Sequence, residues 1–393
     1  MIPKKSLTVL LIIILLNALP ALATDMYLAA LPDMSIEFNS PTSLLNLNLI
    51  LFFLFYGIGL LIWGPLSDRY GRRPILIAGM TAFVLFSILC GLSTDVYQLI
   101  AFRALQGVFG GVAVAVSIAM VKDIYDGRQR ERTYAIVSMM MAFGPILAPV
   151  VGAALLQIMT WRGIFYILAA IGAVALLGCL IMEESLQQRS DRKVLATLGQ
   201  LRVVLRNRRY SRLLPSLSPL GMVVFVWVGI STYIFIEDFG LSQGEFSLFF
   251  ACNAIFFLVG PFLYLYLSRH FDRLRIITFS LAGIVLSGVL VVLIGSIGPL
   301  FFLLSVILGT LSVSITRTPS IDIVMSQVDT DAGSASSIFN FSFMAVGAFG
   351  MMIASLEWDN RILVTGVIFI FVGLVSLSSW LAVRKHYVRS VST

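Results

Sequence analysis

The stretch Gly64-Pro-Leu-Ser-Asp-Arg-Tyr-Gly-Arg-Arg-Pro-Ile-Leu76 is a short charged turn marked by glycine. It lies between two apolar segments that are each long enough to cross a bilayer. Two membrane helices joined by so short a turn must run antiparallel as neighbours. The turn contributes Asp68, Arg69, Arg72 and Arg73. These charges therefore lie where the chain leaves the lipid, in a network of ion pairs that can be made and broken.

Composition places most of the chain in lipid. Only 12% of the 393 residues are charged and 59% are hydrophobic, whereas ordinary soluble domains have about 25% charged residues. Backbone groups in lipid must satisfy their own hydrogen bonds, and the apolar stretches lack the alternation of barrel strands, so a helix bundle is expected. Cys90, Cys179 and Cys252 fall in separate apolar runs without a Cys/His pair. We therefore expect no disulfide, no bound metal and no cofactor.

The apolar runs and their breakers predict an all-α membrane protein with twelve transmembrane helices. The predicted spans lie near residues 7 to 32, 44 to 66, 74 to 93, 96 to 121, 133 to 157, 162 to 182, 212 to 236, 246 to 268, 275 to 295, 298 to 317, 332 to 356 and 361 to 383. Lys4-Lys5, an apolar run and Ala21-Leu-Ala23 imitate a secretory signal. The apolar stretch continues through Leu31, so we expect this segment to remain as the first span.

Charge bias orients these spans. One set of connections carries most of the cations: Lys4, Lys5, the 64 to 76 turn, Lys122, Arg128, Arg130, Arg132, and residues 183 to 211, 269 to 275 and 384 to 389. Because basic connections stay in the cytoplasm, both termini are expected there. The opposite connections hold mainly acids, with only two arginines: Asp33, Glu37, Asp95, Glu237, Asp238, Glu245, Glu357 and Asp359 against Arg162 and Arg361. Orientation thus accounts for the net charge of +7, and nucleic acid is not expected as a partner.

The chain is predicted to divide into two halves. We expect a six-helix bundle over residues 1 to 182, a cytoplasmic linker over 183 to 211 and a second six-helix bundle over 212 to 393. The linker carries apolar residues at the spacing of an interfacial amphipathic helix: Leu195, Leu198, Leu201, Val204 and Leu205. A faint internal repeat supports the division, because residues 66 to 76 align without gaps on residues 267 to 277. The second copy lacks the acid and the glycine of the first.

Four motifs resemble those of the major facilitator superfamily. The turn matches the signature Gly-x-Leu-x-Asp-Arg-x-Gly-Arg-Arg between spans two and three, through Gly64, Asp68, Arg69, Gly71 and Arg72. Span four contains Arg103-Ala-Leu-Gln106-Gly107, which resembles Arg-x-x-Gln-Gly. Span five resembles the motif that marks proton-coupled exporters, through Gly144, Pro145, Pro149 and Gly152. Thr24-Asp25-Met26-Tyr27-Leu28 and the opening of span six, Trp161-Arg162 with Phe165, are similar to the Bcr/CflA drug-resistance subfamily.

This resemblance implies two six-helix bundles that rock about a midplane site, the major facilitator fold. It implies export of lipophilic drugs in exchange for protons by a multi-pass protein of the plasma membrane, which is the inner membrane in a bacterium. The expected partners are a small-molecule substrate, protons and lipid, and we expect a monomer. Two departures from the subfamily are Ala29, where a proline is usual, and Asn17 with its neighbours, where some relatives carry a second membrane acid.

Residue spacing supports a functional role for Asp25 independently of the resemblance. Asp25 precedes Asp33 by eight residues, and Arg103 follows Asp95 by eight. With a rise of 1.5 Å per residue, Asp25 and Arg103 are both expected about 12 Å below the outer boundary. Charged residues at that depth should face the bundle interior and contact each other, directly or through Gln106. Asp25 is then either one half of a static ion pair or the protonation switch of a transporter, and we favour the switch.

The 64 to 76 turn has two possible roles. Asp68 can accept hydrogen bonds from the N-terminus of span eleven, near Asp331, and so latch the two halves together. The family resemblance implies that this latch holds the outward-open state, with Arg72 within reach of Asp123. Alternatively, the cluster only sets the topology through its positive charge.

Polar and aromatic residues in the predicted spans are candidates for lining a cavity that binds substrate. The set comprises Asp25, Tyr27, Tyr56, Gln106, Met140, Trp227, Tyr233, Asn253, Phe256, Asn340 and Phe341. The sequence contains no Gly-Lys pair and hence no nucleotide-binding loop, so the proton gradient is the expected energy source. Proton/drug antiport is the favoured hypothesis. Transport of a physiological metabolite, by export or proton-coupled uptake, is the alternative, and a membrane-embedded enzyme is not expected.

Overall fold

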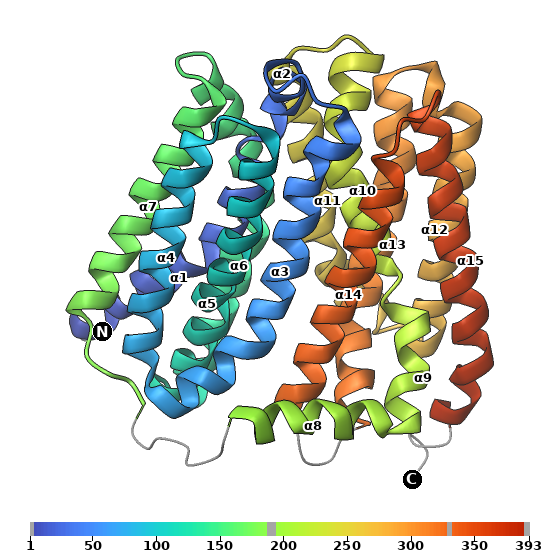
Figure 1. Ribbon diagram of the computed structural model, residues 1–393. Coiled ribbons are helices and arrows are strands. Elements are labelled where there is room, and N and C mark those ends of the chain that lie inside the picture. Colours follow the sequence, from blue (N-terminus) through green and yellow to red (C-terminus); the bar gives the residue numbers. More distant parts are fainter. Residues whose placement is uncertain (1–3, 187–193, 328–331, 389–393) are drawn as a thin grey trace. The chain divides into compact units, whose positions relative to one another are not determined.

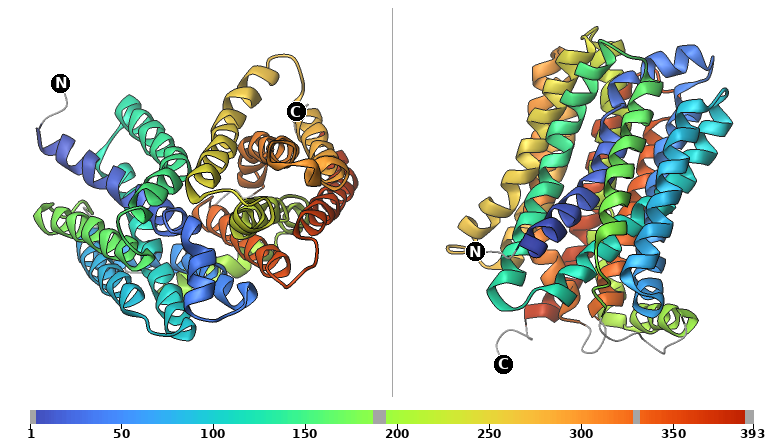
Figure 2. Two further views of the ribbon diagram at one scale, coloured as in Figure 1. Left: turned by 90° about the horizontal axis from the view of Figure 1, so that it is seen from above. Right: turned by 90° about the vertical axis from the view of Figure 1, so that its left-hand side faces the viewer.

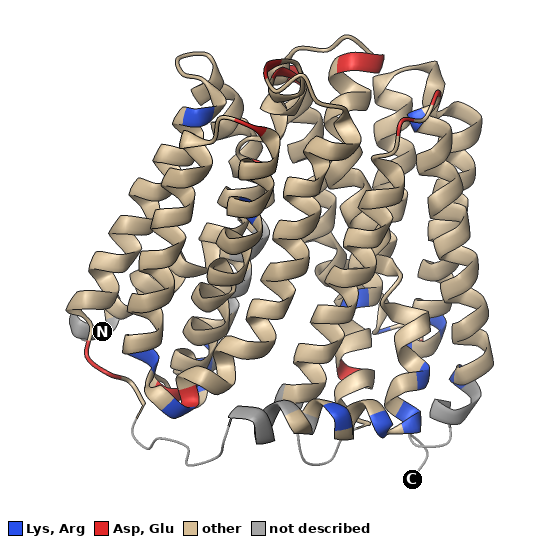
Figure 3. Cartoon of the chain, in the orientation of Figure 1, with Lys and Arg blue, Asp and Glu red and all other residues tan. Residues whose placement is uncertain are grey.

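The computed structural model describes residues 4–186, 194–327 and 332–388, and this part of the chain is helical without strands. The chain divides into two compact units, Met1–Leu198 and Gly199–Thr393. Figure 1 labels the helices. We call the end of each unit that carries the α3–α4 turn or the α11–α12 turn its basic end, and the opposite end its acidic end (Figure 3).

Unit 1 is built from long apolar helices. Its elements are α1 (Lys4–Asp25), η1 (Leu28–Ala30), α2 (Leu31–Glu37), α3 (Thr42–Tyr70), α4 (Arg72–Leu92), α5 (Val96–Ile124), α6 (Gly127–Leu156) and α7 (Trp161–Ile181). Two local signals set their limits. Gly71 separates α3 from α4 with a φ of 106°, which favours glycine. Asp95 caps α5 by accepting hydrogen bonds from the backbone N–H groups of Tyr97 and Gln98.

Helices α3 and α5 pack closely in unit 1 because α5 offers glycine at the contact. A Cβ atom added to Gly107 would lie 2.4 Å from the carbonyl oxygen of Phe52. Such approach of two backbones is the usual role of small residues in membrane helix pairs. Helix α1 runs obliquely to α4 and α7 (Figure 2).

The first predicted span, residues 7 to 32, is not one continuous helix. Helix α1 ends at Asp25, a turn follows, and the chain passes through η1 into α2. Pro32 stands in the first turn of α2. Proline has no N–H group to continue a helical hydrogen-bond ladder and is well suited to the start of a new helix. The break therefore falls where the functional carboxyl group was expected.

Unit 2 follows the same plan. Its elements are α9 (Arg208–Leu217), α10 (Leu220–Tyr233), η2 (Ile234–Asp238), α11 (Gln243–Leu267), α12 (Arg273–Ile294), η3 (Gly295–Ile297), α13 (Pro299–Met325), α14 (Ala332–Ala354) and α15 (Arg361–Val388). Ser242 and Glu245 form a reciprocal capping box at the start of α11. Asp272 caps α12 through the backbone N–H of Leu274, at 3.0 Å.

One predicted limit in unit 2 was wrong. The predicted span 212 to 236 lies within the candidate membrane span Arg208–Asp238, which has a turn near Pro219 where α9 ends and α10 begins. The predicted span 298 to 317 stops too early, because α13 continues through Pro319 to Met325. Membrane helices tolerate an internal proline when neighbouring groups satisfy the freed carbonyl. This extension places Arg317 inside a helix.

Eleven helices in the described part of the chain are long and apolar enough to cross a membrane, so the protein is a multi-pass, all-α membrane protein. The predicted span 133 to 157 falls on α6, whose shorter segment Phe143–Leu156 is apolar. Twelve crossings and cytoplasmic termini stay predictions.

A separate helix, α8 (Val194–Arg206), occupies the predicted linker. Val204 is buried and Leu205 is exposed. The side chains of Leu195 and Leu198 lie outside the described part. The predicted domain limits at 182 and 212 stay predictions.

Candidate functional site

Arg103 forms the centre of a polar cluster inside unit 1. Its side chain is fully buried. Nη1 donates to the carbonyl oxygen of Ala23 (3.1 Å) and to Oε1 of Gln106 (2.5 Å), and Nη2 donates to the hydroxyl oxygen of Tyr27 (3.2 Å). The guanidinium carbon lies 4.2 Å from the ring centroid of Phe52. Aromatic faces and neutral acceptors thus surround this cation.

The predicted contact between Asp25 and Arg103 is wrong. No ion pair joins them among the described residues, and Gln106 does not bridge them, because its amide donates to Ser87 at 2.7 Å. The expected depth of Asp25 was counted along a continuous helix from Asp25 to Asp33. Since α1 ends at Asp25, its last carbonyl groups have no partner within the helix and carry the negative end of its dipole. Arg103 binds one of these, at Ala23, in place of the carboxylate.

Asp25 is buried, with 5% of its surface exposed. Among the described residues it accepts one hydrogen bond, from the hydroxyl group of Thr24 at 2.8 Å. The same hydroxyl oxygen also lies 3.0 Å from the carbonyl oxygen of Pro20 in the same helix, so its one proton is shared between these two acceptors. The carboxyl group is therefore held at the break of the helix by a neutral neighbour.

Tyr27 and Gln106, two predicted substrate ligands, are instead hydrogen-bonded to Arg103 within this cluster. Both side chains are fully buried. The Tyr27 hydroxyl group donates to Oδ1 of Asn48 while accepting from Arg103, and its ring lies 5.2 Å from that of Phe165. Their hydrogen bonds position α3, α5 and the break after α1. Asn48 joins this cluster without having been predicted, and its sequence context, an apolar run with alternating asparagines, is the signal that could have found it.

The span-five motif packs against the same break. A Cβ atom on Gly144 would lie 2.5 Å from the Cβ of Ala21, and one on Gly152 would lie 1.7 Å from the carbonyl oxygen of Met26. Pro145 and Pro149 lie between these glycines inside α6. The glycines thus bring α6 directly onto the segment that carries Asp25. Packing of this motif against the second half stays a prediction.

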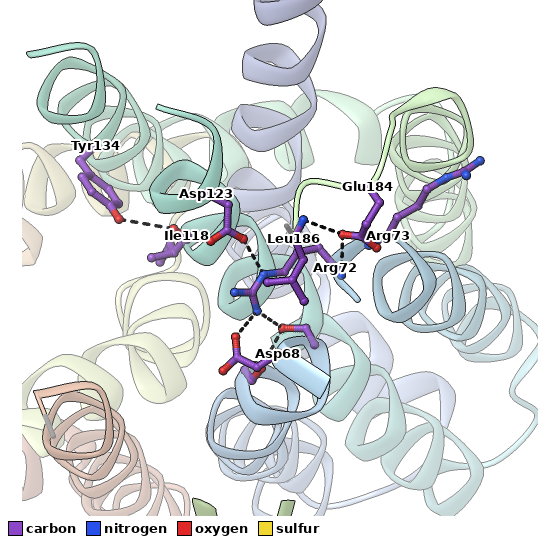
Figure 4. Close-up of polar contacts among 10 residues, drawn as sticks. Asp68, Arg72, Arg73, Ile118, Asp123, Tyr134, Glu184 and Leu186 are labelled. Carbon is purple, nitrogen blue, oxygen red and sulfur yellow. Dashed lines mark hydrogen bonds and ion pairs between the residues drawn. The ribbon is translucent and has the colours of Figure 1, made fainter. Parts of the chain in front are cut away.

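Arg72 holds together the basic end of unit 1 (Figure 4). It forms ion pairs with Asp68 at 2.6 Å and Asp123 at 2.9 Å, and Nη1 also donates to Ser67 at 2.7 Å. The predicted contact between Arg72 and Asp123 is confirmed. Arg69 lies over the ring of Tyr70 instead, with 5.5 Å between its guanidinium carbon and the ring centroid. The turn, α3 and α5 are thereby linked in one charged network.

Glu184 belongs to this network and was missed. Its carboxylate accepts hydrogen bonds from the backbone N–H groups of Arg72 (3.0 Å) and Arg73 (3.2 Å), at the N-terminus of α4. Arg73 in turn donates to the carbonyl oxygen of Leu180, at the end of α7. A carboxylate is favourable at a helix N-terminus. The pair Glu183-Glu184 directly after span six was the available signal.

Each unit carries an ion pair at its acidic end. In unit 1, Arg162 pairs with Glu37, whose other oxygen accepts from the indole N–H of Trp161 at 2.6 Å. In unit 2, Arg361 pairs with Glu237 at 2.6 Å and Asp238 at 3.0 Å. Both arginines that the charge pattern assigned to this side are therefore paired with acids of the same side.

The candidate ligands of unit 2 do not form one group. Trp227 is buried and packs with the rings of Phe250 (5.8 Å between centroids) and Phe302 (6.2 Å). Tyr233 is buried below Arg361, whose guanidinium carbon lies 5.5 Å from its ring centroid. Asn253 is buried, and its Oδ1 has no hydrogen-bond partner among the described residues.

The other candidates are less enclosed. Phe256, Asn340, Phe341 and Met140 are partly exposed, and Tyr56 is buried with its ring stacked on Phe52. Asn340 accepts a hydrogen bond from Arg317, which was not predicted as a site residue because the predicted span 298 to 317 ended at it. No group of three or more His, Cys, Asp or Glu residues in the described ranges could hold a metal ion.

Sequence comparison finds related transporters. The chain is 26% identical over 386 residues to an uncharacterized MFS-type transporter, YdgK, of Bacillus subtilis, which covers 95% of both chains. It is 27% identical over 231 residues to the multidrug resistance protein MdtL of Salmonella paratyphi C, and this match covers 58% of each chain. The match to MdtL thus spans little more than half of that protein's length.

Solved structures share the fold. The nucleoside transporter NupG superposes with a TM-score of 0.74 at 14% identity, over 97% of this chain and 99% of that one. A D-xylose-proton symporter superposes with a TM-score of 0.72 at 16% identity, over 94% and 96%. The sequence profile of the Major Facilitator Superfamily matches residues 13–351. Because this match covers most of the chain, the protein belongs to the Major Facilitator Superfamily, a family of membrane transporters.

Proposed function

We propose that the protein is a proton-coupled antiporter that exports lipophilic drugs or related small molecules by alternating access, with Asp25 as its protonation switch. The observation that carries this proposal is the environment of Asp25. The carboxyl group is buried at a helix break, and its one hydrogen bond among the described residues comes from the hydroxyl group of Thr24.

The protonation state of a carboxylate that is not paired with a cation changes when a proton or a cation approaches it. Burial favours the neutral form of an acid, whereas a nearby cation favours the charged form. Arg103, the cation that we expected to neutralise Asp25, is engaged with Ala23, Gln106 and Tyr27. The charge of Asp25 is then free to be balanced in turn by a proton and by a cationic substrate, as exchange requires.

The break after Asp25 also suits a switch. A residue at a helix terminus changes its surroundings when the following segment moves, whereas one in mid-helix is held by turns on both sides. The segment that follows, Met26 and Tyr27, contacts Gly152 of the span-five motif and Arg103 of the polar cluster. Movement of α6 would therefore displace the segment that follows Asp25 and change the surroundings of its carboxyl group.

The proton gradient can supply the energy for such exchange. A membrane potential of about 150 mV is worth ~3.5 kcal/mol per charge, since 100 mV is worth ~2.3 kcal/mol. This is enough for a substrate gradient of a few hundredfold.

The turn between α3 and α4 is proposed as the gate on the basic side. Asp68 is half exposed and already shares Arg72 with Asp123, so it remains able to accept hydrogen bonds from a further element. We propose the N-terminus of span eleven for that role. Asp331, at its start, lies outside the described residues.

Transport of one physiological metabolite, by export or by proton symport, is the alternative. It differs in the range of substrates, because a metabolite carrier accepts few and polar compounds. Exposure of expressing cells to several unrelated dyes and antibiotics separates the two: broad protection supports drug export, and protection against none favours the metabolite.

The decisive experiment measures exchange of ethidium for protons in proteoliposomes with an imposed pH gradient. We expect Asp25→Asn to abolish exchange, because the variant cannot release a proton. The control is Asp33→Asn, the same change at an exposed acid eight residues later in the chain, which should retain most of the exchange. Undiminished exchange by Asp25→Asn would refute the switch.

A further inference from the structure

Arg317 lies deep inside unit 2. It stands eight residues before the end of α13 at Met325, and Asn340 stands eight residues after the start of α14 at Ala332. With a rise of 1.5 Å per residue, both are about 12 Å from the basic end of their helices. This depth lies well within the apolar part of the span.

The contacts of Arg317 leave its charge uncompensated among the described residues. Nη2 donates to Oδ1 of Asn340 at 3.4 Å, the long limit of a hydrogen bond, and the guanidinium carbon lies 4.6 Å from the ring centroid of Phe343. No described carboxylate lies within 4.0 Å of it. The acid on the same helix, Asp322, pairs instead with Arg273 at 2.8 Å.

The other nitrogen atoms of Arg317 make no hydrogen bond among the described residues. The side chain is partly exposed, and none of its atoms is among the buried polar atoms without a partner, unlike Nε of Arg103. A guanidinium group at this depth is costly against lipid tails and should face the protein interior or water. Its other donors therefore remain available to a further polar group.

We propose that Arg317 binds an anionic group of the transported molecule, and that the substrates include lipophilic carboxylates. A guanidinium group binds a carboxylate with two parallel hydrogen bonds. Asn340, whose amide nitrogen donates to the carbonyl oxygen of Ser336 at 3.0 Å, and the buried ring of Phe343 hold the guanidinium group in position. The inference extends the proposed drug export by naming a substrate class.

The test measures direct binding to the purified protein in nanodiscs. The probes are benzoate, 2-naphthoate and nalidixate, each compared with its ethyl ester, which differs by the loss of the charge. We expect the wild-type protein to bind at least one acid about tenfold or more tighter than its ester, since a hydrogen bond to a charged group contributes about 1.5 kcal/mol or more. Arg317→Gln should reduce that preference to about twofold or less.

Asn340→Asp provides a second variant that leaves Arg317 itself unchanged. It places a carboxylate beside Arg317, so it should abolish the preference for acids and also raise the midpoint of thermal unfolding. Arg269→Gln, an equal charge change at an exposed site of the same unit, should leave the preference intact. Equal binding of acids and esters by the wild-type protein, or a preference that survives in both variants, would overturn the proposal. Ethidium exchange tests the antiport mechanism separately, because its loss would not affect equilibrium binding of the acids.

Discussion

The two units carry ion pairs at corresponding places in the chain. Glu37 and Arg162 are 125 residues apart in unit 1, and Glu237 and Arg361 are 124 apart in unit 2. At the basic ends, Arg72 and Asp123 are 51 residues apart, and Arg273 and Asp322 are 49 apart. Arg273 is also the residue that the gapless repeat aligns with Arg72. At the acidic end, these pairs join α2 to α7 in unit 1 and η2 to α15 in unit 2. At the basic end, they join the start of α4 to α5 in unit 1 and the start of α12 to α13 in unit 2.

The two units share the ion pairs at their ends but differ in the contacts of the arginine in their interior. Unit 1 encloses Arg103 among Ala23, Gln106 and Tyr27, whereas unit 2 leaves Arg317 with one long hydrogen bond. The ion pairs at the ends occur at matching positions in both units, whereas the contacts of the central arginines differ. The charges at the helix ends are paired with acids, whereas Arg317 at mid-depth is not paired with an acid among the described residues.

The largest effect is expected from exchanging Arg103 for glutamine. Arg103→Gln removes three hydrogen bonds and leaves buried acceptors unpaired, so it should lower the free energy of unfolding by about 2 to 4 kcal/mol. Arg317→Gln should change it by less than about 1 kcal/mol, because little is bonded to Arg317. Unfolding titrations with SDS in mixed micelles measure both. Equal losses would mean that the two arginines have the same structural role.

An intermediate effect is expected at the basic ends. Arg72 is 5% exposed and bonds to three side chains, whereas Arg273 has a more exposed single pair with Asp322. Arg72→Gln should therefore cost about 1 to 2 kcal/mol of unfolding free energy, and Arg273→Gln about 0.5 kcal/mol or less. Ethidium exchange should fall severalfold in Arg72→Gln alone. A larger loss in Arg273→Gln would reverse our ranking of the two networks.

The smallest effect is expected at the acidic ends. Glu37→Gln leaves Arg162 without its acid, while Glu237→Gln leaves Arg361 paired with Asp238. Exposed pairs contribute about 0.2 to 1 kcal/mol, so we expect Glu37→Gln to cost about 0.5 kcal/mol more than Glu237→Gln at low salt. Repeating the titration in 1 M NaCl should remove most of that difference. A difference that is independent of salt would show that the hydrogen bond to Trp161 carries it.

Much of the architecture could be predicted because it depends on composition and local chemistry. The apolar spans and the charged 64 to 76 turn follow from residue type and spacing along regular helices, and the contact of Arg72 with Asp123 was implied by the family resemblance. The site was harder to predict. The contact of Asp25 with Arg103 was inferred by counting residues along a straight helix, and the break after Asp25 made that count invalid. Arg317 was missed for the opposite reason, since α13 continues through Pro319.

The sequence alone determined that this chain is a helical membrane protein and which residues carry its charge, because the cost of placing polar groups in lipid depends on residue type and length of run. Only the tertiary structure decided the partner of each charge. Arg103 binds the backbone carbonyl oxygen of Ala23 and not the Asp25 side chain. The last carbonyl groups of a helix have no partner within the helix, and the residue pattern does not show where the helix ends. Partner choice depends on where helices end and how closely they pack, and these are properties of the folded chain.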